Sequence, residues 1–513
     1  MDNSNDNVKV YTVNNRFNVT KHESNADEPE KTVDEGDKLA KAIGSFGLWQ
    51  ILIFLLATVP SKISGIWAQL SIIYLAPKTT FVCVERGNTT EGILNSTCYD
   101  DCVKYEYFSI FESSIISEWG LICERAWLAN FTQTMYMFGV LVGSVMFGFI
   151  ADRYGRRPGI TTAALLQLCC SAAVPFCPNY WTFTAIRFIL GTATAGLLVI
   201  SFVLVVEIVG PSKRELVASV YHIPLSIGEM LMPVFAYYLR RWNTYSIGLA
   251  IPNCIFLTYI FLMPESPKWL ISVGRYDEAS ETMIKAAARN KLPTEGMRDV
   301  VDSIDYECNV DRARREEEKA SYWDLISVAS LRMKNIYSCV SWFILGVSFY
   351  GGNQYVGQTS SDPFLSVGLA AGFQIPGIII SGYSYKRFGR RSTSIVFFCV
   401  CALSNAVLAL PESWHYVKLV CGAIAVACAA GAFSTMYIFT SELFPTVARN
   451  MAMGASSTCS RLGSMIAPFI AGYRGAVWLP PTVFSLAPLL AVVACICLPE
   501  TKGRKMADHI DQC

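Results

Sequence analysis

GFIADRYGRR, at positions 148–157, separates two long apolar runs of the chain. A linker this short can join two helices only if the chain turns at once, and Gly155 and Pro158 are turn-forming residues. The segment holds one acidic residue among three basic ones: Asp152, Arg153, Arg156 and Arg157. Short loops rich in Lys and Arg between apolar runs lie on the cytoplasmic side of a membrane. The stretch therefore predicts a cytoplasmic hairpin between two membrane helices.

The same pattern returns 234 residues later as GYSYKRFGRR, at positions 382–391. Further matches follow in the same order at an offset of 235, in which Glu207, Arg214, Gly228 and Glu265 correspond to Glu442, Arg449, Gly463 and Glu500. Several matches at nearly one offset indicate an internal repeat of about half the chain. Parallel membrane repeats are typical of transporters, whose substrate site lies between the halves near mid-membrane.

The composition also indicates a membrane protein. Of the 513 residues, 52% are hydrophobic and only 16% are charged, whereas about a quarter of the residues in a soluble domain are charged. The net charge is +1, so no broad basic surface points to nucleic acid as a partner.

Twelve apolar runs approach the ~20 residues that a helix needs to cross the hydrocarbon of a bilayer. They fall at about 47–76, 128–150, 159–178, 181–207, 216–239, 245–263, 335–357, 364–385, 392–410, 414–440, 450–472 and 476–498. The predicted fold is an all-α membrane protein with twelve transmembrane helices in two six-helix pseudo-repeats.

The distribution of Lys and Arg orients these helices. Basic residues gather in alternate short loops, apart from Arg240, Arg241 and Arg474, and this bias places both termini in the cytoplasm. We expect five regions: a disordered cytoplasmic tail at 1–44, an N-terminal half at 45–263, a cytoplasmic linker with short amphipathic helices at 264–334, a C-terminal half at 335–498 and a cytoplasmic tail at 499–513.

The segment 77–127 falls between the first two apolar runs, on the side opposite to the basic loops. It contains two glycosylation sequons, which begin at Asn88 and Asn95. It also contains an even number of clustered cysteines: Cys83, Cys98, Cys102 and Cys123. Such a cluster in an oxidising compartment predicts disulfides, although the spacing leaves all three pairings open. We expect a small, glycosylated, disulfide-linked ectodomain; the alternative is that the sequons are accidental.

No cofactor, metal or catalytic site is predicted. The phosphate-binding pattern GxxxxGK[ST] does not occur, and the four histidines do not have the spacing of metal ligands. The chain is therefore not expected to be an enzyme. The energy for transport has to come from the gradient of the substrate, of a coupled ion or of an exchanged solute.

Several of these motifs resemble those of a known transporter family. The stretch 148–157 is similar to the signature between the second and third helices of the major facilitator superfamily. PESPKWL (264–270) and PETKGR (499–504) resemble marks of its sugar-porter and organic-ion branches. SEWGLICER (117–125), FQIPG (373–377) and the large first loop with its cysteines resemble the organic cation, anion and carnitine transporters of solute carrier family 22.

The resemblance implies the major facilitator fold and a polyspecific plasma-membrane carrier of small organic ions. Such a carrier would move organic cations, or zwitterions such as carnitine, by alternating access, with the organic ion and the lipid bilayer as its partners. An organic anion transporter is one alternative; a sugar-porter-type carrier and a non-transporting membrane sensor are others. A sugar porter would have a short first loop and a Gln-Gln pair in its seventh helix, where this chain has GGNQYVGQ (351–358).

Charged residues inside apolar runs are costly and face a cavity or a partner, which makes them candidates for substrate binding. By the resemblance, Arg461 stands where cation carriers have an acid and where anion- and carnitine-type members have an arginine. We expect its guanidinium to pair with a substrate carboxylate; the alternative is an internal ion pair. Lys62, midway along the first run, is either a second positive group of the cavity or a side chain that reaches the interface.

Further candidates lie in other runs. Glu229 would bind a cationic head group or a coupling proton, or would form a structural pair with an arginine. His222 is either a ligand or an interior histidine, and Gln374 stands where cation carriers of the family have Glu, which weakens the cation interpretation. Five aromatic residues could surround a quaternary ammonium by cation–π attraction, or could simply pack: Tyr221, Trp342, Phe349, Tyr350 and Tyr355.

A third group of residues is predicted to form a cytoplasmic gate. Glu207 and Glu442 end equivalent runs, each seven residues before Arg214 or Arg449, which predicts the ion pairs Glu207–Arg214 and Glu442–Arg449. Exposed pairs contribute up to about 1 kcal/mol each, enough to bias two conformations that differ by a few kcal/mol. By the resemblance, the same gate includes Asp152, Arg153, Arg156 and Arg157.

Overall fold

The structure is a computed structural model that describes residues 37–86, 98–100, 102–306, 324–360, 362–473, 475–476 and 478–503. The predicted sequons at Asn88 and Asn95 lie outside the described residues, as does most of the tail predicted at 1–44.

Six membrane-length segments make up the N-terminal half, and three of them are composite. They are α2 (Leu48–Leu70) with α3 (Ile72–Leu75), α5 (Trp127–Tyr154), α6 (Arg156–Ala173), α7 (Tyr180–Ile208), α8 (Pro211–Val220) with α9 (Ile223–Tyr238), and α10 (Trp242–Ala250) with η4 (Ile251–Thr258) and α11 (Tyr259–Leu262).

Six corresponding segments make up the C-terminal half. They are α16 (Ala329–Gly346) joined through the π-helical turn η5 (Val347–Gly351) to α17 (Gly352–Thr359), then α18 (Pro363–Phe388), α19 (Arg390–Val407), α20 (His415–Leu443), α21 (Thr446–Ala471) and α22 (Leu479–Cys497). The twelve-helix prediction is therefore confirmed, with its boundaries correct to within a few residues.

Eight helices in the described part of the chain are long and apolar enough to cross a membrane. The other four predicted spans are interrupted or more polar. The α8–α9 span breaks at Tyr221 and His222, and α16–α17 changes to π-helical turns at Val347. The remaining two, α19 and α21, carry many Ser, Thr, Asn and Arg residues. Polar residues in these spans indicate that they face other helices rather than lipid alone.

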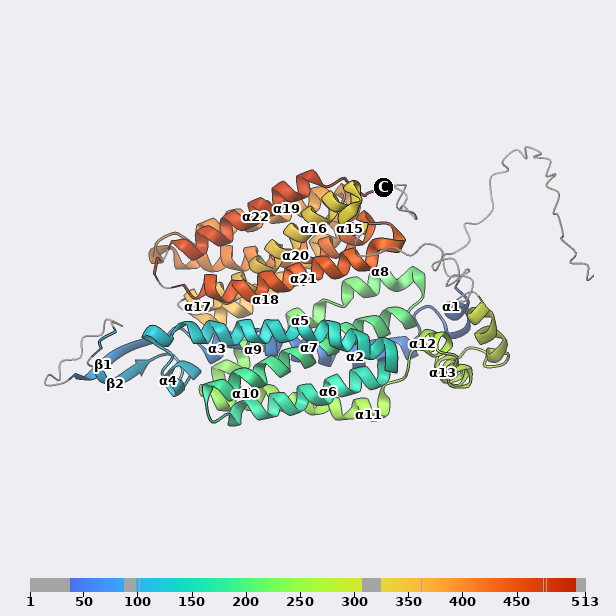
Figure 1. Ribbon diagram of the computed structural model, residues 1–513, viewed down its shortest axis with the longest axis horizontal. Coiled ribbons are helices and arrows are strands. Elements are labelled where there is room, and N and C mark those ends of the chain that lie inside the picture. Colours follow the sequence, from blue (N-terminus) through green and yellow to red (C-terminus); the bar gives the residue numbers. More distant parts are fainter. Residues whose placement is uncertain are drawn as a thin grey trace, which may run out of the picture.

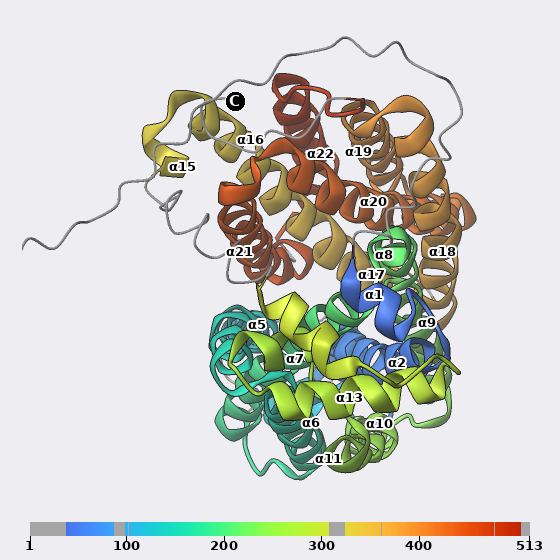
Figure 2. The same ribbon diagram turned by 90° about the vertical axis from the view of Figure 1, so that its right-hand side faces the viewer.

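The two halves lie side by side with their helices along the long axis of the molecule (Figure 1). The segment between α3 and α5 projects from one end, here called the hairpin end. The opposite end, here called the linker end, carries α1 (Lys38–Ile43), α12 (Pro267–Ser272) and α13 (Tyr276–Arg289), which face the viewer in Figure 2. The halves pack on each other through α5 against α21 and α9 against α18.

A single residue separates α5 from α6, and this explains the motif at 148–157. Gly155 has a backbone φ of 109°, and its counterpart Gly389, between α18 and α19, has a φ of 99°. Side chains other than Gly strongly disfavour this region of φ. A Cβ at Gly155 would also collide with the carboxylate of Glu265. Pro158 lies in the first turn of α6, where its missing N–H leaves no hydrogen bond unmade.

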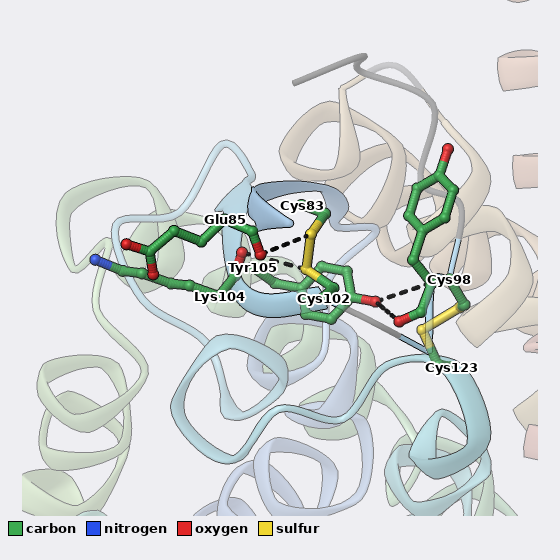
Figure 3. The surroundings of a disulfide bond; sticks show 8 residues. Cys83, Glu85, Cys98, Cys102, Lys104, Tyr105 and Cys123 are labelled. Carbon is green, nitrogen blue, oxygen red and sulfur yellow. Dashed lines mark hydrogen bonds between the residues drawn. A yellow bond between two sulfur atoms is a disulfide. The ribbon is translucent and has the colours of Figure 1, made fainter. Parts of the chain in front are cut away.

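The hairpin-end segment contains two short strands that the all-α prediction did not include. β1 (Thr80–Arg86) and β2 (Cys102–Phe108) pair antiparallel. Both are rich in β-branched and aromatic residues, which favour strands. The disulfides Cys83–Cys102 and Cys98–Cys123 select one of the three open pairings (Figure 3). The first joins the two strands, and the second ties the segment to the turn η2 (Cys123–Arg125) that precedes α5.

The end of the predicted disordered tail is ordered, which corrects the boundary at residue 44. α1 buries Leu39 and Ile43, which belong to the same apolar cluster as residues of α13. The side chain of Asn290, just after α13, donates to the carbonyl of Ile43 at 2.6 Å and accepts from the amide of Trp49 at 2.8 Å. A polar-looking tail becomes helical here because its few apolar residues lie on one face.

Candidate functional site

Arg461 and Lys62 are charged residues on membrane helices of different halves. Arg461 lies on α21 and Lys62 on α2, and their charges are near enough to interact. Tyr350 accepts a hydrogen bond from Nη1 of Arg461 at 3.3 Å. Arg461 and Tyr350 are only half-buried. We infer that the two cations border an accessible space between the halves.

Neither cation forms an ion pair with an Asp or Glu among the described residues. Lys62 is 7% exposed, and its Nζ lies 3.9 Å from the centroid of the Tyr221 ring. The Tyr221 hydroxyl is in turn held by Ser201 at 3.0 Å and by the carbonyl of Leu198 at 2.9 Å. Lys62 therefore already occupies a cation–π position on the ring that the sequence suggested for a substrate ammonium.

A cluster of aromatic side chains extends from Tyr221, on which Lys62 lies, through His222 to Tyr437 and Trp342. Trp342 is fully buried and donates from its indole N–H to Thr440 at 2.9 Å. Its ring meets that of Tyr437 edge to face at 4.7 Å, and His222 lies 6.0 Å from Tyr437 across the two halves. Sequence reasoning missed Tyr437, which links Trp342 of its own half to His222 of the other half. Nothing in the local pattern of α20 distinguishes this tyrosine from one that only packs.

Glu229 and Gln374 form a separate contact between the halves. The amide of Gln374 on α18 donates to Oε2 of Glu229 on α9 at 2.9 Å, and Ser226 donates to the amide oxygen of Gln374 at 3.2 Å. Glu229 and Gln374 are both fully buried, and Oε1 of Glu229 has no hydrogen-bond partner. Within the described residues, Glu229 has no Lys or Arg partner, so the expected structural pair with an arginine is not seen.

At the linker end, Arg156 is the centre of a charged cluster in the N-terminal half. Its Nη2 lies 2.7 Å from Oε1 of Glu207, and its Nε lies 3.1 Å from Oε2. Nη1 of Arg156 lies 3.2 Å from Asp152, whose side chain is 77% exposed. Nη1 also donates to the carbonyl of Ala151 at 2.8 Å. The guanidinium therefore binds the mostly buried carboxylate of Glu207 and the exposed carboxylate of Asp152.

Glu265 completes this cluster. Its two carboxylate oxygens accept the backbone N–H groups of Arg156, at 2.7 Å, and Arg157, at 3.1 Å, at the start of α6. A helix N-terminus favours such an anion. Burial raises the pKa of the Glu265 carboxyl, and the hydrogen bonds from the amides act in the opposite direction.

The C-terminal half repeats the arrangement. Arg390 binds Glu442 at 2.7 Å, and the amides of Arg390 and Arg391 donate to the carboxylate of Glu500 at 2.8 and 3.1 Å. Thr501 donates to Glu442 at 2.7 Å. The roles of Glu265 and Glu500 were missed at the sequence level, although both residues belong to the 235-residue repeat that could have revealed them.

The predicted pair Glu207–Arg214 is not the one that the structure shows, since Glu207 binds Arg156. In the other half Glu442 binds Arg390. Arg214 instead lies 3.5 Å from Asp37, which Lys268 also approaches at 3.5 Å. The sequence spacing of seven residues misled the prediction because the chain turns into α8 at Gly210. Of the other basic residues of the motif, Arg157 donates to the carbonyl of Ile260 at 3.0 Å, and Arg153 is exposed.

Comparison with known families gives one family match. Residues 89–511 match the family described as sugar (and other) transporter. Solute carrier family 22 member 12 of Mus musculus is 32% identical, over 80% of this chain and 74% of its own. Organic cation/carnitine transporter 2 of Homo sapiens is 30% identical, over 79% and 72%. An organic cation transporter protein of Drosophila melanogaster is 28% identical, over 93% and 94%.

The structure is also similar to solved transporters. The inward-open xylose transporter XylE from E. coli superposes with a TM-score of 0.63, covering 89% of this chain and 98% of that chain, at 17% sequence identity. At this identity the likeness shows the fold, and the two-half architecture of the major facilitators is therefore confirmed.

Proposed function

The chain belongs to the family of sugar and other transporters and, within it, to solute carrier family 22, and from this premise we propose that it carries small organic ions bearing a carboxylate. Zwitterions of the carnitine type are the first candidates, and organic anions are the second. The observation that carries the proposal is the pair Arg461 and Lys62, two cations from opposite halves that have no acidic ion-pair partner among the described residues. Members of this family are transporters, so the chain is not an enzyme.

Charge decides which end of a zwitterion meets this pair. A substrate cation about 4 Å from one of these groups would be repelled by about 4 kcal/mol at an effective dielectric constant of 20, and a carboxylate would be attracted by as much. The planar fork of Arg461 matches a carboxylate in two hydrogen bonds. The hydroxyl of Tyr350, which already bonds to Arg461, supports the orientation of the guanidinium.

The cationic end of a zwitterion would lie against the aromatic cluster. We propose the ring of Tyr437, which is only partly buried, since the face of Tyr221 is already taken by Lys62 and Trp342 is fully buried against Tyr437. An ammonium over an aromatic face gains about 0.5–2 kcal/mol. This arrangement keeps the candidate residues Tyr350, Trp342 and His222 at the site.

A carrier of simple organic cations is the second candidate function, and one observation favours it. Oε1 of Glu229 is buried without a partner, which leaves a free acceptor for an ammonium. The two candidates separate in proteoliposomes that take up a radiolabelled cation, zwitterion or anion under imposed proton and sodium gradients. Saturable zwitterion uptake that an aliphatic carboxylate inhibits would support the first; uptake of the cation alone would support the second and contradict the first.

We further propose that the protein lies in the plasma membrane with the hairpin end outside and both termini inside. The disulfides Cys83–Cys102 and Cys98–Cys123 lie at the hairpin end and need an oxidising compartment. The basic clusters around Arg156 and Arg390 lie at the linker end, as the positive-inside rule requires.

Glycosylation tests this orientation. Treatment with an N-glycosidase is expected to increase the gel mobility of the protein from the plasma membrane, and Asn88→Gln/Asn95→Gln is expected to abolish the shift. Asn18→Gln, in the sequon that this orientation places inside, and Asn130→Gln, in the first turn of α5, should leave the shift unchanged. A shift that survives in the double variant and disappears in Asn18→Gln would reverse the orientation.

The ion pairs at the linker end lie within one half each, so we propose that they keep each half rigid while the halves rock. Asp152 is the exposed member of its cluster and is the one available to meet the other half when the linker end closes. Asp152→Asn is therefore expected to shift the carrier towards the conformation open at the linker end. The shift should be modest, because an exposed ion pair contributes up to about 1 kcal/mol, which is about a fivefold change in populations.

The rate at which a thiol reagent modifies a cysteine introduced at the linker end of α21 measures this shift. Modification should be faster in Asp152→Asn and unchanged in Glu281→Gln, which removes an exposed carboxylate from a pair on α13. Equal rates in both variants, at normal surface expression, would contradict the gate assignment of Asp152.

A further inference from the structure

A cavity of about 620 Å³ lies at the hairpin end and shares no residue with the site around Arg461. Several parts of the chain surround it, among them the following three. Ile73 and Lys78 lie at the end of α3 and just beyond it, Tyr355 and Gln358 lie on α17, and Lys418 lies in the first turn of α20. The cavity therefore has walls from both halves. Its volume is in the range of pockets that bind small organic molecules.

The charged residues of the cavity are all basic. Lys78, Lys418 and His415 line it, and among the residues that the structure describes no Asp or Glu does. Lys418 is half-buried and His415 is exposed. Lys418 and His415 lie at the N-terminus of α20, whose first turn contains no acidic residue. A helix N-terminus favours anions and disfavours cations. An anion bound here would satisfy the helix dipole and the side chains together.

The remaining lining is apolar, which specifies the rest of the ligand. Ile73, Val356, Leu408 and Leu419 line the cavity together with the ring of Tyr355. Apolar walls with a few convergent polar groups are typical of sites for small organic ligands. A ligand that fits has a ring system for the walls and a carboxylate or sulfonate for the basic groups.

Contacts that close the hairpin end border the same cavity. Gln358 donates to the carbonyl of Ala76 at 3.2 Å, and the hydroxyl of Tyr74 lies 3.4 Å from the carbonyl of Pro363. Gly357 packs directly against Ile73. Each contact joins the N-terminal half to the C-terminal half. The cavity is complete only while these contacts hold, so a ligand in it stabilises the conformation that is closed at the hairpin end.

We propose that this cavity is an outer binding site for aromatic organic anions, whose occupancy slows uptake by holding the hairpin end closed. The proposal rests on the orientation proposed above, but it does not require Arg461. Inhibition at this site should reduce the maximal rate of uptake, because a substrate at Arg461 does not compete for the cavity.

The probe is benzophenone-4-carboxylate, a photoreactive aromatic anion applied to intact cells, with labelled peptides mapped by mass spectrometry. Labels are expected on peptides that contain Tyr355, Val356 or Leu419. Lys78→Gln/Lys418→Gln should reduce this labelling at least fivefold. Lys285→Gln at the linker end should leave it unchanged, and so should Arg461→Gln, even where that variant no longer transports.

Labelling that disappears in Arg461→Gln and persists in Lys78→Gln/Lys418→Gln would overturn the proposal and would place the anion at the central site. A cationic probe, 4-(aminomethyl)benzophenone, provides a test on the unaltered protein should the double variant fail to reach the surface. It should label the same peptides at least fivefold less than the carboxylate does, and equal labelling would contradict the charge argument. If the wild-type protein took up no zwitterion, the proposed function would be refuted. The labelling result would still test the outer site.

Discussion

Arg461→Gln is expected to reduce the uptake of a carnitine-type zwitterion, measured as kcat/KM, by about thirtyfold to several thousandfold. Removing one partner of a buried, hydrogen-bonded charge pair costs about 2–5 kcal/mol, and a guanidinium can donate two parallel hydrogen bonds to a carboxylate. Lys62 supplies a second charge but is held over Tyr221. Arg461→Lys should recover part of the loss, since it restores the charge without the planar fork.

Arg461→Asp extends the test to selectivity. An acid at this position should abolish zwitterion and anion uptake and should leave or increase the uptake of a simple cation, because the local charge is reversed. Arg289→Gln, an exposed arginine at the end of α13, serves as the matched control and should transport normally. Zwitterion or anion uptake that persists in Arg461→Asp, at equal surface expression, would show that the carboxylate binds elsewhere.

Arg156→Gln is expected to destabilise the protein by about 3–5 kcal/mol, which would lower its melting temperature in detergent and its surface expression. The side chain is only 10% exposed, and its removal leaves the mostly buried carboxylate of Glu207 without its partner. Breaking a buried ion pair on one side costs about this much, since an unpaired charge remains in a poorly solvated site. Arg390→Gln should have a similar effect in the other half through Glu442.

The double variant Arg156→Gln/Glu207→Gln separates pairing from packing. It should be more stable than Arg156→Gln, because no unpaired charge remains. Arg275→Gln, which breaks a pair whose side chains are half-exposed, should change stability by less than about 1 kcal/mol. If Arg156→Gln melted like Arg275→Gln, the cluster would have no structural role.

The contacts of Arg156 and Arg390 change the interpretation of Asp152. In the sequence it is the single acid of a basic motif, and Lys386 stands at the equivalent position of the second copy. In the structure Glu207 and Glu265 contribute most of the acidic contacts to the motif, and both have equivalents in the second half. Asp152 adds an exposed contact that only one half possesses.

The sequence by itself determined the membrane fold, the two halves, the hairpin at Gly155 and the candidates Arg461 and Lys62. Each of these follows from the composition, from the lengths of the apolar runs or from the internal repeat. Such patterns can be read along the chain, because they involve neighbouring residues or residues at one fixed offset in the sequence. Only the tertiary structure decided four other features. They are the pairing of the four cysteines, the partners of Glu207 and Glu442, the contact of Glu229 with Gln374, and the place of Tyr437 in the site. Each joins residues from different segments, and the physical reason is that helix packing sets distances between segments that no spacing along the chain encodes.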